Sequence, residues 1–95
     1  MAETPETKLT RKILDKLNKI EGCRAEKLHG GPYGKQKLDV FGAKNGKMFY
    51  LEIKVPGNGP TPKQVSTIRK WKTEAGVLAT WIDTVEDAER MVNQL

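Results

Sequence analysis

The dipeptide Asn45-Gly46 constrains the fold of this chain more than any other feature. Asn-Gly between two runs of apolar residues is the strongest short-range signal for a two-residue β-hairpin turn. With these two residues at the centre of the turn, residues 38–43 and 48–55 become neighbouring antiparallel strands. The register of the pair then follows by counting outward from the turn.

That register brings two acidic residues and a lysine together. Asp39 lies opposite Glu52, and directly opposite residues have Cβ atoms roughly 4.5–5.5 Å apart on one face of a sheet. Lys54 lies two positions beyond Glu52, so it points to the same face. Two carboxylates this close repel unless a positive group lies between them. We therefore predict a site for a hard divalent cation with a lysine beside it, which is a site that acts on phosphate.

Alternation along the second strand assigns its residues to two faces. Phe49, Leu51 and Ile53 share one face with Val40, whereas Tyr50, Glu52 and Lys54 occupy the other. Both faces carry apolar residues, as expected of central strands that helices cover on both sides.

Periodicity and capping signals predict the other elements. Thr4-Pro5-Glu6 reads as a helix start, and apolar residues at helical spacing follow as far as Gly22. The predicted elements are a helix up to residue 22, strands at residues 23–28, 38–43, 48–55 and 77–82, a helix from residue 61 to 75, and a last helix capped by Asp83 or Thr84. The order α-β-β-β-α-β-α predicts an α/β fold with a mixed β-sheet flanked by helices, because strand, helix and strand in succession imply a βαβ crossover.

The length and the cysteine content narrow the class of protein. Ninety-five residues suit a single domain over 1–95, and a dimer would help so small a domain bury surface. No apolar run approaches the roughly 18 residues of a membrane span, and the N-terminus does not read as a secretory signal. Cys23 cannot form an internal disulfide, which fits a cytoplasmic location. One His and one Cys cannot build a structural zinc site.

Charge is distributed unevenly along the chain. Residues 24–72 hold 11 Lys or Arg against 3 Asp or Glu, and two of those three acids are Asp39 and Glu52. Residues 73–95 hold 1 Lys or Arg against 5 Asp or Glu. A positive field around an acidic pair favours a polyanion that approaches a metal. The alternative is that the lysines only solvate the surface.

A glycine-rich basic segment precedes the first acid of the pair. His29, Tyr33, Lys35 and Lys37 lie in it or at its edges, and we name them as candidate nucleic-acid contacts together with Lys63. Such a loop can follow a phosphate backbone and stack an aromatic ring on a base. A plain connecting loop explains the same composition equally well.

Glu6 is a second candidate ligand whose role stays open. It lies on the line of the apolar stripe of the first helix, three positions before Leu9 and seven before Ile13. An acid on the inward face could point toward a metal. It could equally only favour the helix dipole.

The predicted chemistry follows from what magnesium requires. Mg²⁺ keeps several waters and takes one or two carboxylates, which Asp39 and Glu52 supply, with the Ile53 carbonyl within reach. The cation would polarise a scissile phosphate, while Lys54 would orient water or neutralise developing charge. An ordinary surface pair on a strand is the alternative. The apolar neighbours and the poor strand propensity of Asp argue against it.

These residues resemble a known nuclease signature. Asp39, twelve intervening residues and Glu52-Ile53-Lys54 look like the PD-(D/E)XK motif, with Leu38 where the motif name has proline. More narrowly, the chain resembles the VRR-NUC family, the virus-type replication-repair nucleases. That resemblance runs through KLDVFG, YLEIKVPGNGPTPKQ and EAGVLATWIDTVEDA, and the stretch from Glu52 to Gln64 is its specific part.

The resemblance implies a fold and a role for each matching residue. It implies a restriction-endonuclease-like core with Asp39 and Glu52 as metal ligands and Lys54 as the catalytic lysine. Gln64 matches a glutamine that faces the active site, although Thr61-x-x-Gln64 also reads as a capping box, and the two roles conflict on the sequence alone. Glu6 matches the acid of the first helix.

Stand-alone members of this family are similar to Holliday-junction resolvases. The resemblance therefore implies a homodimeric, Mg²⁺- or Mn²⁺-dependent endonuclease that cuts branched DNA, such as a four-way junction, encoded by a phage or prophage and acting in the cytoplasm of a bacterial host. Two alternatives remain open: a nuclease without junction selectivity, and a non-catalytic nucleic-acid-binding module. The acids within a positive field argue against the second.

Overall fold

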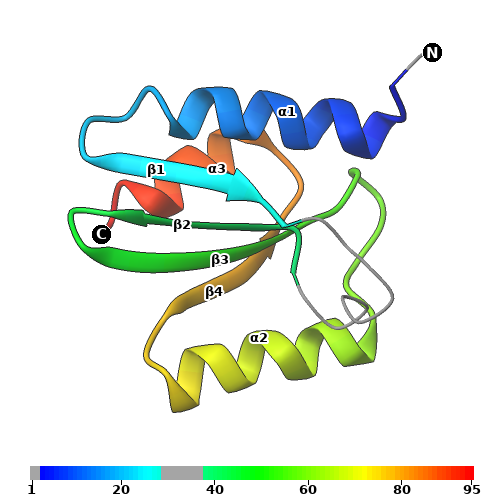
Figure 1. The fold of residues 1–95 in the computed structure, drawn as a ribbon. Helices are drawn as coiled ribbons and strands as arrows, with labels where there is room; N and C mark the ends of the chain where they lie inside the picture. The colour runs from blue at the N-terminus through cyan, green and yellow to red at the C-terminus, as the bar shows by residue number, and fades with distance from the viewer. Residues whose placement is uncertain (1–2, 29–37) are drawn as a thin grey trace.

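A computed structural model describes residues 3–28 and 38–95 of the chain. It contains seven elements in the predicted order α-β-β-β-α-β-α (Figure 1). They are α1 (Pro5–Leu17), β1 (Cys23–Lys27), β2 (Val40–Lys44), β3 (Lys47–Ile53), α2 (Pro62–Glu74), β4 (Leu78–Ile82) and α3 (Val85–Val92).

The strands form one mixed sheet in the order β1-β2-β3-β4. The pairs β1–β2 and β2–β3 are antiparallel, and β4 runs parallel to β3. The connection between those two parallel strands is α2, as the βαβ prediction requires (Figure 1). The predicted mixed α/β architecture is therefore confirmed.

The hairpin between β2 and β3 has the predicted turn and register. Asn45 has φ 52° and Gly46 has φ 83°, and two positive φ values at the centre are what a type I′ turn requires. Outward from the turn the pairing runs to Val40 opposite Leu51, where the ladder ends. Asp39 therefore lies one residue beyond the paired part of β2.

The two faces of the sheet are covered differently. Val40, Phe49, Leu51 and Ile53 are fully buried in one cluster, as the predicted alternation requires. Helices α1 and α3 cover that face, supplying buried residues that include Ile13, Leu17, Ala88 and Val92. On the other face a smaller cluster of Leu38, Tyr50 and Ala79 packs against partly buried residues such as Ile68 of α2.

Each helix begins at a threonine cap. The Thr4 and Thr84 hydroxyls accept from backbone N–H groups three residues on, and Thr84 rather than Asp83 caps α3. The first helix ends at Leu17, earlier than Gly22, which instead has φ 77° in the turn before β1. None of the helices in residues 3–28 and 38–95 is long and apolar enough to cross a membrane.

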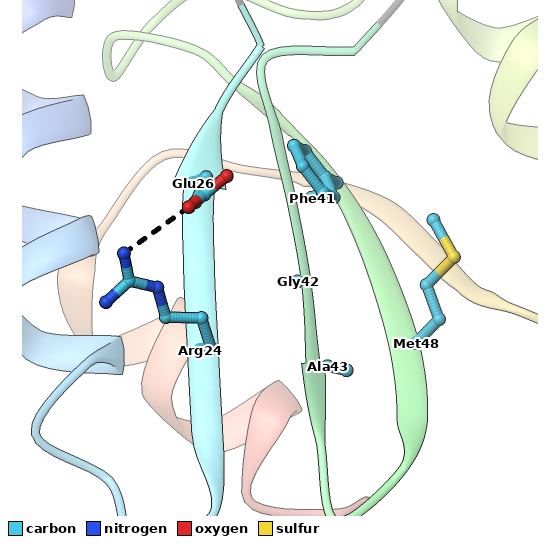
Figure 2. Close-up of a pocket in the computed structure, with 6 residues that line it drawn as sticks. All are labelled: Arg24, Glu26, Phe41, Gly42, Ala43 and Met48. Atoms are coloured by element: carbon cyan, nitrogen blue, oxygen red, sulfur yellow. Dashed lines mark hydrogen bonds and ion pairs between the residues drawn. The ribbon is translucent and has the colours of Figure 1, made fainter.

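The second face is only partly covered, because α2 lies mainly against β4 at one side of the sheet. No residue of α2 is buried. Over β1, β2 and β3 the face forms an open hollow of about 430 Å³, and Figure 2 shows the side chains around it. They are Arg24, Glu26, Phe41, Gly42, Ala43 and Met48, none of them a predicted site residue.

The close approach of β1, β2 and β3 at Gly42 predicts a stability effect. A Cβ there would lie 2.3 Å from the Arg24 carbonyl oxygen and 2.9 Å from the Ala25 Cα. Because both atoms are backbone, the strands themselves would have to move. We expect Gly42→Ala to lower the free energy of unfolding by about 1–3 kcal/mol or more in urea titrations.

The matched control is Gly59→Ala, since nothing lies within 4 Å of a Cβ at that position. Its free energy of unfolding should stay within about 0.5 kcal/mol of the parent value. Equal stability of the two variants would contradict the packing of the central strands.

Candidate active site

Asp39 lies at a bend immediately before β2 and is partly buried. Its Oδ2 accepts a hydrogen bond from the Ile53 N–H at 3.0 Å. Its own carbonyl accepts from the Leu28 N–H at 2.8 Å. Asp39 is therefore bonded to the ends of two strands, β1 and β3, while it lies outside the ladder itself.

Glu52 is the most deeply buried charged residue in the described part of the chain, with 2% of its surface exposed. Its Oε2 accepts from Gln64 Nε2 at 2.7 Å and lies 3.4 Å from Lys54 Nζ. Its Oε1 is buried and has no hydrogen-bond partner. Since an unpartnered buried carboxylate oxygen is costly, Oε1 is the atom that a ligand would satisfy.

Lys54 follows β3 and shares the face of Glu52, as the alternation predicted. Its backbone N–H donates to the Ile82 carbonyl at 2.9 Å, so the first residue after β3 is still tied to β4. The side chain is 18% exposed. The ammonium group is therefore held beside the buried carboxylate, and part of the side chain reaches the surface.

The two acids and the lysine interact electrostatically. Burial and, next to it, the nearby Asp39 carboxylate together raise the pKa of Glu52 to about 7. The Lys54 ammonium acts in the opposite direction but does not cancel these effects. The predicted grouping of Asp39, Glu52 and Lys54 is therefore present in the structure.

Gln64 performs both of the roles that conflicted on the sequence alone. Its Oε1 accepts from the Thr61 N–H at 2.9 Å, and the Thr61 hydroxyl accepts from the Gln64 N–H at 3.2 Å, which completes the capping box of α2. Because Oε1 is engaged there, the amide nitrogen is directed at Glu52 Oε2. The cap thus orients the side chain toward the site.

Glu6 does not lie on the buried face of α1, although it is in line with the apolar stripe. It is exposed in the first turn of α1, where an acid favours the positive end of the helix dipole. Of the two alternatives left open for Glu6, the exposed position agrees with the helix-dipole role, because the buried part of α1 begins later, at Thr10 and Ile13. No group of three His, Cys, Asp or Glu suited to a metal occurs in residues 3–28 and 38–95, so Glu6 does not join the acidic pair here.

The candidate nucleic-acid contacts are only partly described. His29, Tyr33, Lys35 and Lys37 lie outside the described residues. Lys63 is exposed in the first turn of α2, directly before Gln64 in the chain. The role of all five residues stays a prediction.

Two contacts of the site were not foreseen from the sequence. The Ile53 N–H reaches the site by donating to Asp39, whereas the sequence had suggested the Ile53 carbonyl. The Tyr50 hydroxyl accepts from the Leu38 N–H at 3.0 Å, next to that same acid. The only sequence signal for the second contact was the position of Tyr50, two residues before Glu52 and on the same face of the strand.

The arrangement suits a small hard cation. Two carboxylates provide oxygen ligands, and one of those oxygens is buried without a partner. Magnesium takes one or two carboxylates and keeps water in its other positions. The residues present therefore fit such an ion.

The fold matches that of a solved structure described as a VRR_NUC domain. The TM-score is 0.77 at 14% sequence identity, and the match covers 96% of this chain and 97% of that one. The chain has the fold of a VRR_NUC domain. No family model matches the sequence, and no curated protein matches it significantly. The fold expected from the resemblance is thus confirmed from structure.

The raised pKa of Glu52 predicts a pH-dependent stability in metal-free solution. The folded-state pKa is about 7 against an ordinary 4.5, so between these pH values the folded chain binds more protons than the unfolded chain. The free energy of unfolding should then fall as pH rises from 5 to 8, by on the order of 3 kcal/mol at most.

Glu52→Gln isolates this effect, because it removes the titrating group and leaves an oxygen for Gln64. With EDTA present, the free energy of unfolding of the variant, relative to that of the parent, should increase from pH 5 to pH 8. A difference that stays constant across this range would contradict the raised pKa.

Proposed function

We propose that this chain is a metal-dependent endonuclease that hydrolyses phosphodiester bonds in DNA. The observation that carries the proposal is the buried, unpartnered Oε1 of Glu52 beside Asp39 and Lys54. A purely structural acid at that depth would have both oxygens satisfied. The likeness to a VRR_NUC domain, a nuclease by its name, supports the same conclusion.

The two carboxylates would hold Mg²⁺ or Mn²⁺. Glu52 Oε1 and the Asp39 carboxylate are the proposed ligands, with the Ile53 carbonyl and water completing the set. A cation bound there supplies Lewis-acid polarisation of a phosphate oxygen and a bound water of lowered pKa. Asp39 Oδ2 is already oriented by the Ile53 amide, so little reorganisation is needed on binding.

Lys54 and Gln64 have complementary tasks in this proposal. The Lys54 ammonium neutralises negative charge that develops on the phosphate or orients the attacking water. Gln64 donates to Oε2, holding that oxygen and leaving Oε1 for the cation. Because the capping box fixes the amide, this division between the two oxygens is built into the start of α2.

The charge distribution supports DNA as the partner. The segment 24–72 carries the excess of positive charge, and it contains the whole proposed site from Asp39 to Gln64. Positive charge around the site attracts a phosphate backbone, and Lys63 is an exposed contact beside it. His29, Tyr33, Lys35 and Lys37 are the further contacts that we propose.

We propose branched DNA, in particular a four-way junction, as the substrate and a homodimer as the active form, in the cytoplasm of a bacterial host. This finer proposal follows from the resemblance to resolvase-like nucleases and from symmetry, since a two-fold enzyme suits a two-fold junction. A nuclease without junction selectivity would use the same residues.

Asp39→Asn tests the proposed activity. The asparagine keeps an oxygen for the Ile53 amide but loses the negative charge. With Mg²⁺ the parent should cut a labelled four-way junction faster than a matched linear duplex, and the variant should cut neither. Failure of the parent to cut either DNA while still binding it would instead indicate a binding module. Equal cutting of both DNAs would remove junction selectivity.

Lys54→Ala tests the role of the ammonium group. Cutting should fall by about 10²–10³-fold, the usual loss for a group that stabilises transition-state charge, while junction binding survives. The matched control is Lys47→Ala, an exposed lysine at the start of the same strand β3. If the two variants cut equally well, Lys54 has no catalytic role.

A further inference from the structure

We propose that the Tyr50 hydroxyl is a positioning group for Asp39, and that it sets the metal affinity of the acidic pair through its hydrogen bond with the Leu38 N–H. This inference rests on the proposed function, because it concerns the cation that Asp39 and Glu52 would bind. Tyr50 itself would touch neither the cation nor the DNA.

The need for such a group follows from where Asp39 lies. The β2–β3 ladder ends at Val40 opposite Leu51, so the Leu38–Asp39 segment lacks ladder hydrogen bonds to β3. Asp39 occupies a bend rather than a strand. A ligand there needs other contacts to keep it at a fixed distance from Glu52.

Tyr50 supplies the contact on the N-terminal side of Asp39. Its hydroxyl oxygen accepts from the Leu38 N–H at 3.0 Å. Leu38 is 1% exposed and Tyr50 is 4% exposed, so water cannot replace this bond without opening the cluster. The Leu38 amide, one residue before that of Asp39, is thereby held by a side chain of β3.

Two further hydrogen bonds hold Asp39 itself. The Leu28 N–H donates to the Asp39 carbonyl at 2.8 Å, and the Ile53 N–H donates to Oδ2 at 3.0 Å. Both of these donors are backbone groups, which no substitution of a side chain removes. Of the three hydrogen-bond partners, only the Tyr50 hydroxyl belongs to a side chain. It is therefore the partner that depends on the identity of the residue.

The tyrosine ring is held in turn from α2. Tyr50 and Trp71 make an edge-to-face contact, with ring centroids 5.1 Å apart and planes at 79°. Gln64 of the same helix donates to Glu52. One helix therefore contacts Glu52 directly and Asp39 through Tyr50, which ties the spacing of the two acids to the position of α2.

Loss of the hydroxyl should weaken metal binding while the fold survives. Tyr50→Phe keeps the ring against Trp71 but leaves the buried Leu38 N–H without an acceptor, so the backbone of Leu38 and the acid that follows it are less restrained. Removing a group that orients a metal ligand typically lowers metal affinity by about 10–100-fold.

The experiment is calorimetric titration of Mn²⁺ into the full chain without DNA. We expect the Mn²⁺ dissociation constant to rise by about tenfold or more in Tyr50→Phe. Trp71→Phe is the matched control, since it disturbs the same ring contact but keeps the hydroxyl, and it should bind Mn²⁺ nearly as the parent does. Equal affinity in Tyr50→Phe and the parent, or an equal loss in both variants, would overturn the role of the hydroxyl.

Asp39→Asn in the same titration separates this inference from the proposed function. A parent that binds Mn²⁺, with binding lost in Asp39→Asn and unchanged in Tyr50→Phe, would overturn the inference alone. A parent that binds no Mn²⁺ would overturn both. In cleavage assays Tyr50→Phe should need more Mn²⁺ for half-maximal rate at an unchanged KM for DNA.

A measurement on the parent covers the case in which Tyr50→Phe does not fold. Amide hydrogen exchange followed by NMR should show the Leu38 N–H protected to a degree similar to the ladder amides of β2, because its acceptor is buried. Exchange at the rate of an exposed loop amide would overturn the inference.

Discussion

The register between β2 and β3 is the constraint on which the rest of the structure depends. The turn at Asn45 and Gly46 sets it, and side chains alternate with a period of two, so a slip of one residue would exchange the two faces of β3. Phe49 and Leu51 would then leave the core that α1 and α3 cover, and Glu52 would enter it. One turn therefore determines both the packing of the core and the place of the acids.

The site is built where the sheet stops being regular. Glu52 is the last but one residue of β3, and Asp39 lies just outside the ladder. One oxygen of the Glu52 carboxylate is held by Gln64 and the other is unpartnered. The raised pKa of Glu52 reflects the same burial: the fold keeps an acid at a depth that is unfavourable without a cation.

The crossover helix α2 connects these features. It has no buried residue, yet Gln64 in its first turn bonds to Glu52, and Trp71 near its other end packs on Tyr50. Its position therefore depends on a few specific contacts more than on a large apolar interface. A helix held in this way contributes to the geometry of the site more than to the core.

The sequence alone determined the local part of this protein: the hairpin and its register, the order of the elements, the threonine caps and the grouping of Asp39, Glu52 and Lys54. These depend on turn chemistry, on periodicity and on counting along paired strands, which are short-range rules. The packing of the elements against one another decided that Gln64 both caps and donates, that Glu6 is exposed, and that the Tyr50 hydroxyl accepts from the Leu38 N–H. Those outcomes depend on the distance between elements and on where along a helix burial begins. A hydrogen bond between two elements forms only at a short distance, and the spacing of residues within one element does not specify that distance.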